Sequence, residues 1–230
     1  MSEPKRLCIV GATGLIGTAV IAQAVGAPDI RVTGIARREV ALPAGAQMEM
    51  LLADPSGWDD AIAVARPDVF VCALGTTWAK AGQDKAAFRA IDYDLVLACA
   101  RAAKAAGAGH MIVVSSVGAS IAAKPFYLQV KGELEDALAK LHFRRLDILR
   151  PGLLRGEREG DRRPGERFAS MISPLTDVFL HGGARKYRSI PAETVAAAIL
   201  ALARTKPGGR FVHEHDAMLY AIRRSGQGRG

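Results

Sequence analysis

The chain has 230 residues, half of them hydrophobic and 23% charged, which excludes a disordered or collagen-like protein and suits one large domain. The net charge of +8 lies wholly in residues 111–230, where basic and acidic side chains are interleaved without a DNA-binding motif, so we expect an anionic cofactor or substrate and no nucleic acid. The three cysteines cannot all pair and lack zinc-ligand spacing, which predicts a reducing compartment.

The first notable segment is uncharged from Leu7 to Pro28, nearly long enough to cross a bilayer. It contains four glycines, divides into a short β-like part and a helical part, and has no convincing cleavage site after it. We therefore predict a soluble, cytoplasmic protein without a membrane partner.

Short apolar runs alternate with amphipathic stretches along the chain. The predicted strands are residues 6–10, 30–35, 47–52, 68–74, 110–115, 146–149 and 209–213. The predicted helices are residues 15–25, 58–65, 86–106, 127–141 and 192–203. This alternation predicts the α/β class, as a Rossmann-type doubly wound parallel sheet in a single domain over residues 1–222.

Two segments break the alternation. Residues 153–190 are rich in Gly, Arg and Pro, with one short helix expected near 168–180, and we expect a small substrate or lid region there. Residues 223–230 are predicted to be a disordered tail.

A glycine loop, Gly11-Ala-Thr-Gly-Leu-Ile-Gly17, follows the first predicted strand directly and opens a helix. Its spacing allows a tight turn, close approach to a diphosphate, and close packing of helix on strand, while the helix N-terminus attracts the anion. A glycine turn without a ligand is the alternative. The predicted cofactor contacts in this loop are Gly11, Thr13, Gly14, Leu15, Ile16 and Gly17.

The end of the second strand favours NADP(H) over NAD(H). Many NAD-binding proteins have an acidic residue there for the ribose 2′-hydroxyl, whereas this chain has Arg37 and Arg38, which suit a 2′-phosphate. Glu39 could compete as their partner, and two solvated turn arginines are the alternative. Asp54, Leu74 and Gly75 follow the third and fourth strands, and we expect them on the adenosine side.

Serine, tyrosine and lysine residues form the candidate catalytic group. Tyr127 and Lys131 are four residues apart on one predicted helix, and an ammonium near a phenol makes it a better acid/base catalyst. Ser115 and Ser116 end the fifth strand, where one hydroxyl could hold a substrate carbonyl. A surface Tyr–Lys pair without catalytic function is the alternative.

These motifs, in this order, resemble the short-chain dehydrogenase/reductase superfamily, in particular the atypical Tat-interacting tumour-suppressor oxidoreductase group. The resemblance spans residues 5–205 and is carried by the glycine loop and by Cys72-Ala-Leu-Gly-Thr-Thr77, Val114-Ser-Ser116, Tyr127-Leu-Gln-Val-Lys-Gly-Glu133 and Leu149-Arg-Pro-Gly152. It implies NADPH binding, with Tyr127 as acid/base, Lys131 as the contact to the cofactor ribose and the partner that shifts the pKa of Tyr127, and Ser116 as the carbonyl holder. Tyr127 and Lys131 therefore count among the cofactor contacts as well. It also places Pro151 and Gly152 near the nicotinamide.

One departure concerns the helix at Ile91-Asp-Tyr-Asp-Leu95, which lacks the asparagine that classical members use in a proton relay. The sequence predicts an NADPH-dependent reductase acting on a carbonyl of a small metabolite. The alternatives are an NADP(H)-binding regulatory or assembly protein with little turnover, and a nucleotide-sugar epimerase or dehydratase. We predict no metal, although His213 and His215 could offer two ligands, and a homodimer is the assembly to test.

Overall fold

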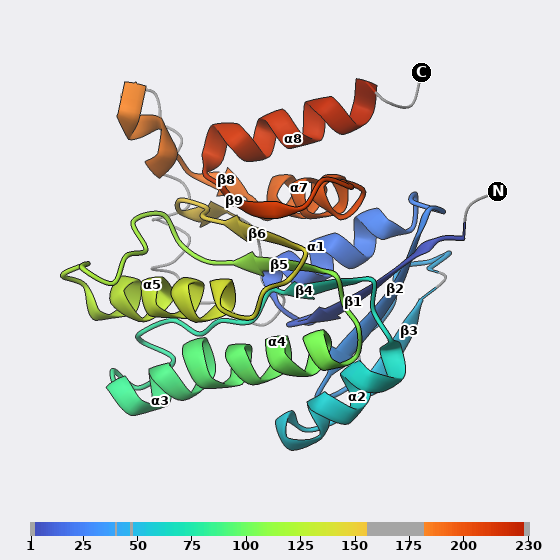
Figure 1. Cartoon of the computed structure of the whole chain (residues 1–230), viewed down its shortest axis with the longest axis horizontal. Helices are drawn as coiled ribbons and strands as arrows, with labels where there is room; N and C mark the ends of the chain where they lie inside the picture. The colour runs from blue at the N-terminus through green and yellow to red at the C-terminus, as the bar shows by residue number, and fades with distance from the viewer. Residues whose placement is uncertain (1–2, 40, 47, 156–181, 228–230) are drawn as a thin grey trace.

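A seven-stranded, wholly parallel sheet forms the centre of the protein, in the order β3-β2-β1-β4-β5-β6-β9 (Figure 1). The computed structural model describes residues 3–39, 41–46, 48–155 and 182–227. The strands are β1 (Lys5–Val10), β2 (Ile30–Ala36), β3 (Glu49–Leu52), β4 (Val69–Cys72), β5 (His110–Val114), β6 (Arg145–Leu149) and β9 (Gly209–His213). The predicted Rossmann-type α/β fold is therefore confirmed.

Helices cover both faces of the sheet. The α-helices are α1 (Leu15–Ala24), α2 (Trp58–Ala65), α3 (Lys85–Arg89), α4 (Val96–Ala105), α5 (Phe126–Ala139), α7 (Ala192–Ala203) and α8 (His215–Gln227). One face carries α1 and α7, with α8 packed against α7, and α2, α4 and α5 lie on the other face (Figure 1). No helix within the described ranges has the length and apolar content needed to cross a membrane.

The alternation of side chains along each strand explains the two hydrophobic cores. In β1, Leu7 and Ile9 are buried beneath α1 and α7, whereas Cys8 and Val10 are buried beneath α2, α4 and α5. Successive side chains of a strand point to opposite faces, so a parallel sheet covered on both sides needs nearly continuous apolar strands. Without these runs the sheet could not be buried on both faces.

The strand order reverses at β1, which lies between β2 and β4. In an open parallel sheet, ligands bind in the crevice outside the carboxyl ends of the strands at such a reversal. The glycine loop follows β1 at this edge, so the topology brings it beside the segment after β4.

Three features differ from the sequence expectation or extend it. The helix predicted for residues 86–106 is divided by a π-helical segment, η2 (Ala90–Leu95), between α3 and α4. Helix α8 was not predicted, and it includes residues 223–227 of the expected disordered tail. Within the irregular region, β7 (Leu154–Arg155) pairs with β8 (Ile190–Pro191), and a short 3₁₀ helix, η3 (Gly182–Tyr187), precedes β8. The short helix expected near 168–180 lies outside the described residues.

Candidate cofactor and catalytic site

The glycine loop is tightly built against the neighbouring strand end. Gly11 has a φ of +81°, and a Cβ there would lie 2.6 Å from the carbonyl oxygen of Ala73, just beyond β4. A Cβ on Gly17 would collide with the carbonyl oxygen of Gly11. Gly14 is the N-cap of α1, and the first turn of that helix contains no acidic residue. The loop therefore presents a helix N-terminus without a competing carboxylate at the strand reversal.

The remaining residues of the predicted loop contacts lie around this helix start. Thr13 is exposed, Leu15 is half-buried and Ile16 is buried in the core beneath α1. The buried Ile16 side chain fixes the helix on the sheet, so only its backbone amide is available to a ligand.

The two arginines expected at a 2′-phosphate follow β2 at the same sheet edge. Arg37 and Arg38 are both exposed, and neither has an ion-pair partner within the described part of the chain. Glu39, the expected competitor, forms no ion pair with them there. Asp54 is exposed and precedes the short 3₁₀ helix η1 (Pro55–Gly57) after β3. Among the residues that the structure describes, nothing competes with an anion for these two guanidinium groups.

The segment after β4 is held by a carboxylate from the π-helical segment. The backbone N–H of Thr76 donates a hydrogen bond to Asp92 Oδ2 at 2.8 Å. Leu74 is half-buried and Gly75 is exposed, and a Cβ on Gly75 would lie 3.4 Å from Asp92 Oδ1. The loop after β4 is thus fixed beside the glycine loop.

The two candidate serines have different partners. The Ser115 hydroxyl is buried and donates a hydrogen bond to Glu135 Oε1 at 2.6 Å, and Arg150 also binds the Glu135 carboxylate. Ser116 is half-buried, and its hydroxyl has only a long contact of 3.4 Å with the carbonyl oxygen of Val117. Because the Ser115 hydroxyl is buried and bonded to Glu135, the Ser116 hydroxyl is the one at the end of β5 that a substrate can reach more easily.

Tyr127 and Lys131 lie on consecutive turns at the start of α5, as the spacing predicts. Tyr127 is 42% exposed, whereas Lys131 is 8% exposed and its Nζ lies 2.8 Å from Asp92 Oδ1. Edge-to-face contacts among Trp78, Phe88 and Phe126 pack the loop after β4 onto α3 and the first residue of α5. The phenol of Tyr127 is therefore accessible, while the ammonium of Lys131, one turn later, is held by Asp92.

The segments after β5 and β6 are joined at this edge. The N–H of Val117 donates to the carbonyl oxygen of Pro151 at 3.0 Å, which brings the turn after Ser116 to the Pro151-Gly152 segment. A Cβ on Gly152 would collide with the carbonyl oxygen of Arg188, so a glycine is required there. The predicted site residues thus lie in the segments that follow the carboxyl ends of neighbouring strands or, as with Tyr127 and Lys131 in α5, in the first turns of the helices that come next.

Sequence reasoning missed two partners of these residues. From the sequence, the segment around Asp92 is informative only because it lacks the asparagine of classical members. In the structure, the Asp92 carboxylate pairs with Lys131. Glu135 was not singled out, although it lies four residues after Lys131 on the same face of α5 and binds Ser115. The regular spacing of Tyr127, Lys131 and Glu135 was the signal available in the sequence.

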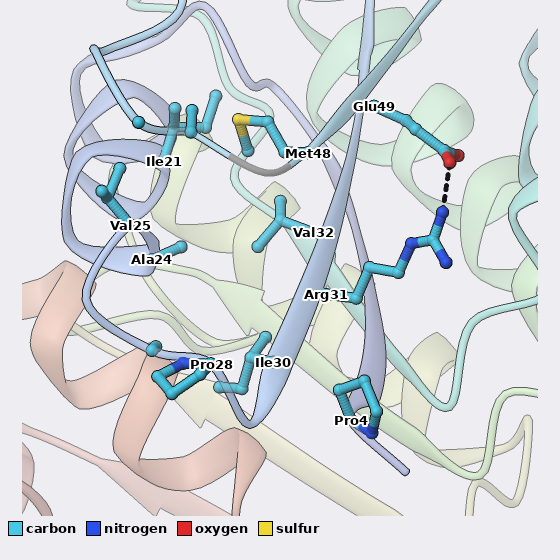
Figure 2. A pocket seen from close by; sticks show the side chains of 13 residues that line it. Pro4, Ile21, Ala24, Val25, Pro28, Ile30, Arg31, Val32, Met48 and Glu49 are labelled. Atoms are coloured by element: carbon cyan, nitrogen blue, oxygen red, sulfur yellow. Dashed lines mark hydrogen bonds and ion pairs between the residues drawn. The ribbon is translucent and has the colours of Figure 1, made fainter.

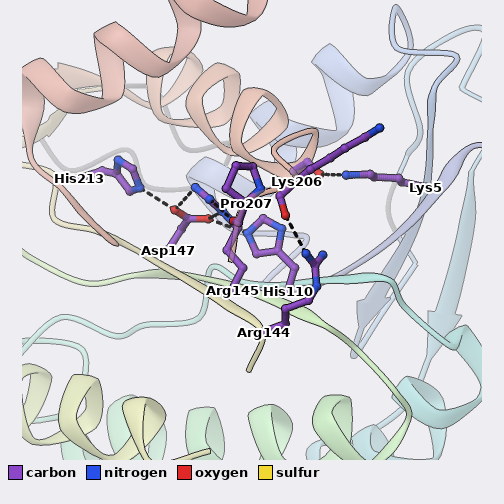
Figure 3. A network of polar contacts seen from close by, with 9 residues as sticks. Lys5, His110, Arg144, Arg145, Asp147, Lys206, Pro207 and His213 are labelled. Carbon is purple, nitrogen blue, oxygen red and sulfur yellow. Dashed lines mark hydrogen bonds and ion pairs between the residues drawn. The ribbon is translucent and has the colours of Figure 1, made fainter. Parts of the chain in front are cut away.

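A second buried polar cluster joins β5, β6 and β9 away from this site (Figure 3). Its centre is Asp147, which accepts hydrogen bonds from His110 Nε2 at 2.6 Å, His213 Nε2 at 2.7 Å and Arg145 Nε at 2.6 Å. Burial alone would raise the pKa of Asp147, but these bonds outweigh it and hold the pKa below its usual range. Burial lowers the pKa of His110, an effect that the bond to Asp147 only partly opposes.

His213 is therefore engaged by a carboxylate, and the chain leaves β9 before His215, which begins α8. A metal site at these two histidines would require both to lie on one face of a strand. They do not, because only His213 belongs to β9. No group of three potential metal ligands occurs among residues that the structure describes.

A cavity of about 610 Å³ lies at the opposite, amino-terminal edge of the sheet (Figure 2). It is bounded by α1, β2 and the segment before β3, with the Arg31–Glu49 ion pair at its rim. The described residues that connect β2 to β3 form no helix, which leaves this space beside α1. None of the predicted site residues lines the cavity.

Comparisons with known proteins give the family. The HIM1 family model matches residues 63–182, more than half of the chain. The chain is 38% identical over 173 residues to "Protein FMP52, mitochondrial" of Candida albicans, covering 73% of this chain and 75% of the relative. It is 37% identical over 203 residues to Protein HTATIP2 of Rattus norvegicus, covering 86% and 81% respectively. The resemblance to the Tat-interacting group is thereby confirmed.

Solved structures with the same fold include enzymes of the short-chain dehydrogenase/reductase type. MoeE5 in complex with UDP-glucose and NAD has a TM-score of 0.68 at 16% identity, over 97% of this chain and 82% of that one. A UDP-N-acetylglucosamine 4-epimerase from Methanobrevibacter ruminantium also has a TM-score of 0.68 at 16% identity, over 93% and 77%. At this identity the likeness concerns the fold.

The relatives overturn the cytoplasmic prediction, because FMP52 proteins such as those of Candida albicans and Saccharomyces cerevisiae are named mitochondrial. The error has a physical reason: cysteine usage reports a reducing environment and does not distinguish the compartments that provide one. The family model, the two groups of relatives and the shared Rossmann-type fold agree, and the chain belongs to the HIM1 family.

Proposed function

We propose that the protein is an NADPH-dependent oxidoreductase that reduces a carbonyl group of a small metabolite. One observation carries the proposal: an exposed Tyr127 lies one turn before a buried, fixed Lys131, at the sheet edge that also holds the glycine loop. The NAD named in the MoeE5 complex supports a nicotinamide dinucleotide as the cofactor class.

The residues present fit such a cofactor. The glycine loop and the N-terminus of α1 would hold the diphosphate, and the unpaired guanidinium groups of Arg37 and Arg38 would hold a 2′-phosphate. Asp54, Leu74 and Gly75 would lie along the adenosine side, and Pro151 and Gly152 near the nicotinamide. NADPH, when bound, supplies the hydride.

The catalytic residues would handle the proton and the carbonyl. The Ser116 hydroxyl donates a hydrogen bond to the substrate carbonyl oxygen and holds it in place. Tyr127 would donate its phenolic proton to that oxygen, so that the reduced carbonyl group leaves as an alcohol. The Lys131 ammonium stabilises the phenolate that remains.

Cofactor choice is tested by replacing both arginines. Arg37→Ala with Arg38→Ala should weaken NADPH binding by about tenfold to hundredfold, because two charge-assisted contacts to the phosphate are lost, and should change NADH binding little. Titration calorimetry measures both affinities. Arg101→Ala, which removes an exposed arginine from α4, serves as the control. Equal weakening of NADPH and NADH would defeat the 2′-phosphate assignment.

The chemistry is tested in the same preparation by an NADPH-oxidation screen across carbonyl compounds. Tyr127→Phe should abolish oxidation while leaving NADPH affinity largely intact, and Tyr220→Phe, at an exposed position of α8, should do neither. Cofactor binding without turnover would favour a regulatory protein. The nucleotide sugars named for the neighbouring structures make an epimerase the third candidate, and it would show no net NADPH consumption.

A further inference from the structure

The ion pair between Asp92 and Lys131 connects three parts of the candidate site. The side chains of Asp92 and Lys131 are 1% and 10% exposed, with the ammonium 2.8 Å from Oδ1. The other carboxylate oxygen accepts from the backbone of Thr76 in the loop after β4. A Cβ on Gly75 would lie 3.4 Å from Asp92 Oδ1 and 3.7 Å from Lys131 Nζ. The pair therefore borders the crevice in which a dinucleotide would lie.

Fold stability does not explain the pair. Removing two charges from water costs about as much as, or more than, their attraction returns, and an apolar replacement is often at least as stable. The burial pattern of η2 is also the reverse of the usual one, in which apolar side chains face inward. The acidic Asp92 is buried, whereas the neighbouring Ile91 is 37% exposed. Single π turns inside α-helices often occur at functional sites.

The other charged groups that face α5 have partners of their own. On the α3 side Arg89 pairs with Glu133, at the end of β6 Arg150 pairs with Glu135, and Lys85 lies over the Phe126 ring. At the end of β4, burial raises the pKa of Cys72 to about 12, so its thiol is neutral. In the described part of the chain, Asp92 is the carboxylate that balances Lys131.

We propose that Asp92 is a positioning residue that holds the Lys131 ammonium and offsets its field at the nicotinamide, while the ammonium still acts on the phenol one turn away. The site would then accept the oxidised, cationic nicotinamide as well as the reduced one. This inference rests on the proposed function. If Arg37 and Arg38 hold the adenosine end of the cofactor, as proposed above, its nicotinamide would lie toward Tyr127 and this pair. An uncompensated ammonium there repels NADP⁺ more than NADPH, because only the oxidised ring is charged.

The test compares dissociation constants for NADP⁺ and NADPH, measured by titration calorimetry at pH 7 and fixed salt. For Asp92→Asn, the ratio of the NADP⁺ constant to the NADPH constant should rise by about tenfold, because one uncompensated charge would then act on the cationic ring in a medium whose effective dielectric constant is far below that of water. The matched control is Asp94→Asn, which removes the same charge from an exposed position of η2 and should leave the ratio unchanged.

Two further variants keep the test decisive should Asp92→Asn fold poorly. Lys131→Met should move the ratio in the opposite direction, toward tighter NADP⁺. The double variant with Asp92→Asn and Lys131→Met should return it close to the wild-type value, since the net charge is again unchanged. The double variant should also melt at a higher temperature than Asp92→Asn, which leaves a buried ammonium unpaired.

Each outcome has one meaning. Equal weakening of both cofactor forms by Asp92→Asn, or a double variant no closer to wild type than the single ones, overturns the proposal while the proposed function stands. If neither NADP⁺ nor NADPH binds to the wild-type protein, the proposed function and this inference are overturned together.

Discussion

At the end of β5, one buried hydrogen bond distinguishes two neighbouring serine hydroxyls, those of Ser115 and Ser116. The sequence indicated a serine role but left Ser115 and Ser116 open until the family resemblance favoured the second. The bond from Ser115 to Glu135 occupies one hydroxyl and leaves the other accessible. Ser116 as the carbonyl-holding residue stays a prediction, now with a local reason.

The limits of prediction at single residues are clearest at Asp92. The sequence shows its type and its place near Tyr93 and Asp94, and nothing in that string indicates which acidic side chain points inward. The choice depends on the π turn and on contacts with Lys131 and Thr76 from distant parts of the chain. Such long-range pairings are outside the reach of local patterns.

The close contact at Gly17 gives a prediction at this scale. Gly17→Ala should lower the free energy of unfolding by about 1–3 kcal/mol, since the new methyl group collides with the backbone of the glycine loop, and should weaken NADPH binding as the loop moves. Chemical denaturation and calorimetry check the two effects. Gly26→Ala, with nothing within 4 Å of the added Cβ, should be nearly neutral. Equal effects of the two variants would refute the steric explanation.

At the scale of elements, the apolar strands and the Ala-rich helices were predictable because their periods are regular. The seven predicted strands match the seven-stranded sheet, with shorter bounds for some of them, such as β4. Helix α8 was missed because its strongly polar composition and the Ser-Gly-Gln-Gly sequence near its end are typical of a tail. Its stability comes from Met218, which is fully buried against the core beneath α7.

The Asp147 cluster, which ties β9 to β5 and β6, predicts a pH dependence. Burial lowers the pKa of His110, so the folded state takes up its proton less readily than the unfolded chain does. The stabilisation is complete above the unfolded pKa of about 6.5 and is lost as the pH falls below it, at up to about 1.4 kcal/mol per pH unit.

His110→Gln should flatten this slope between about pH 6.5 and 5, as measured by urea unfolding across that range. His142→Gln, which removes an exposed imidazole outside this cluster, serves as the control. The pKa of Asp147 is lowered in the folded state, so the stability that this carboxylate contributes is lost only below its unfolded pKa of about 3.9. That range is separate from the range in which His110 acts. Identical slopes for all three proteins would exclude His110 as the group responsible.

At the scale of the whole molecule, the fold could be predicted from the sequence and the compartment could not. Parallel strands and the glycine loop encode the architecture through burial and backbone geometry. Amino-acid composition does not identify the subcellular compartment, because a mitochondrial protein and a cytoplasmic protein can have the same composition. Residues 156–181, where the sequence predicts part of a substrate or lid region, lie outside the described residues.

The three cysteines give a reporter of global unfolding. All lie in the core between the sheet and α2, α4 and α5, and burial raises the pKa of Cys8 and Cys72 to about 12 and that of Cys99 above its usual range. At pH 8 a thiol reagent should therefore label the native protein only as fast as it unfolds globally. Val64→Cys, at an exposed position of α2, should label at once. Rapid labelling of wild-type thiols would indicate local opening of this core.

The π turn also constrains how this chain can change in length. It holds one more residue than the α-helical turn it replaces, and each residue advances an α-helix by about 100°. Deleting a single residue from Ala90–Leu95 would therefore restore a regular helix and keep its two ends, α3 and α4, nearly in phase with each other. The aromatic contacts of Phe88 and the packing of α4 would both be kept, and the one inward side chain at stake is Asp92 within the turn. A one-residue deletion here would therefore remove the carboxylate without disturbing the helix on either side of it.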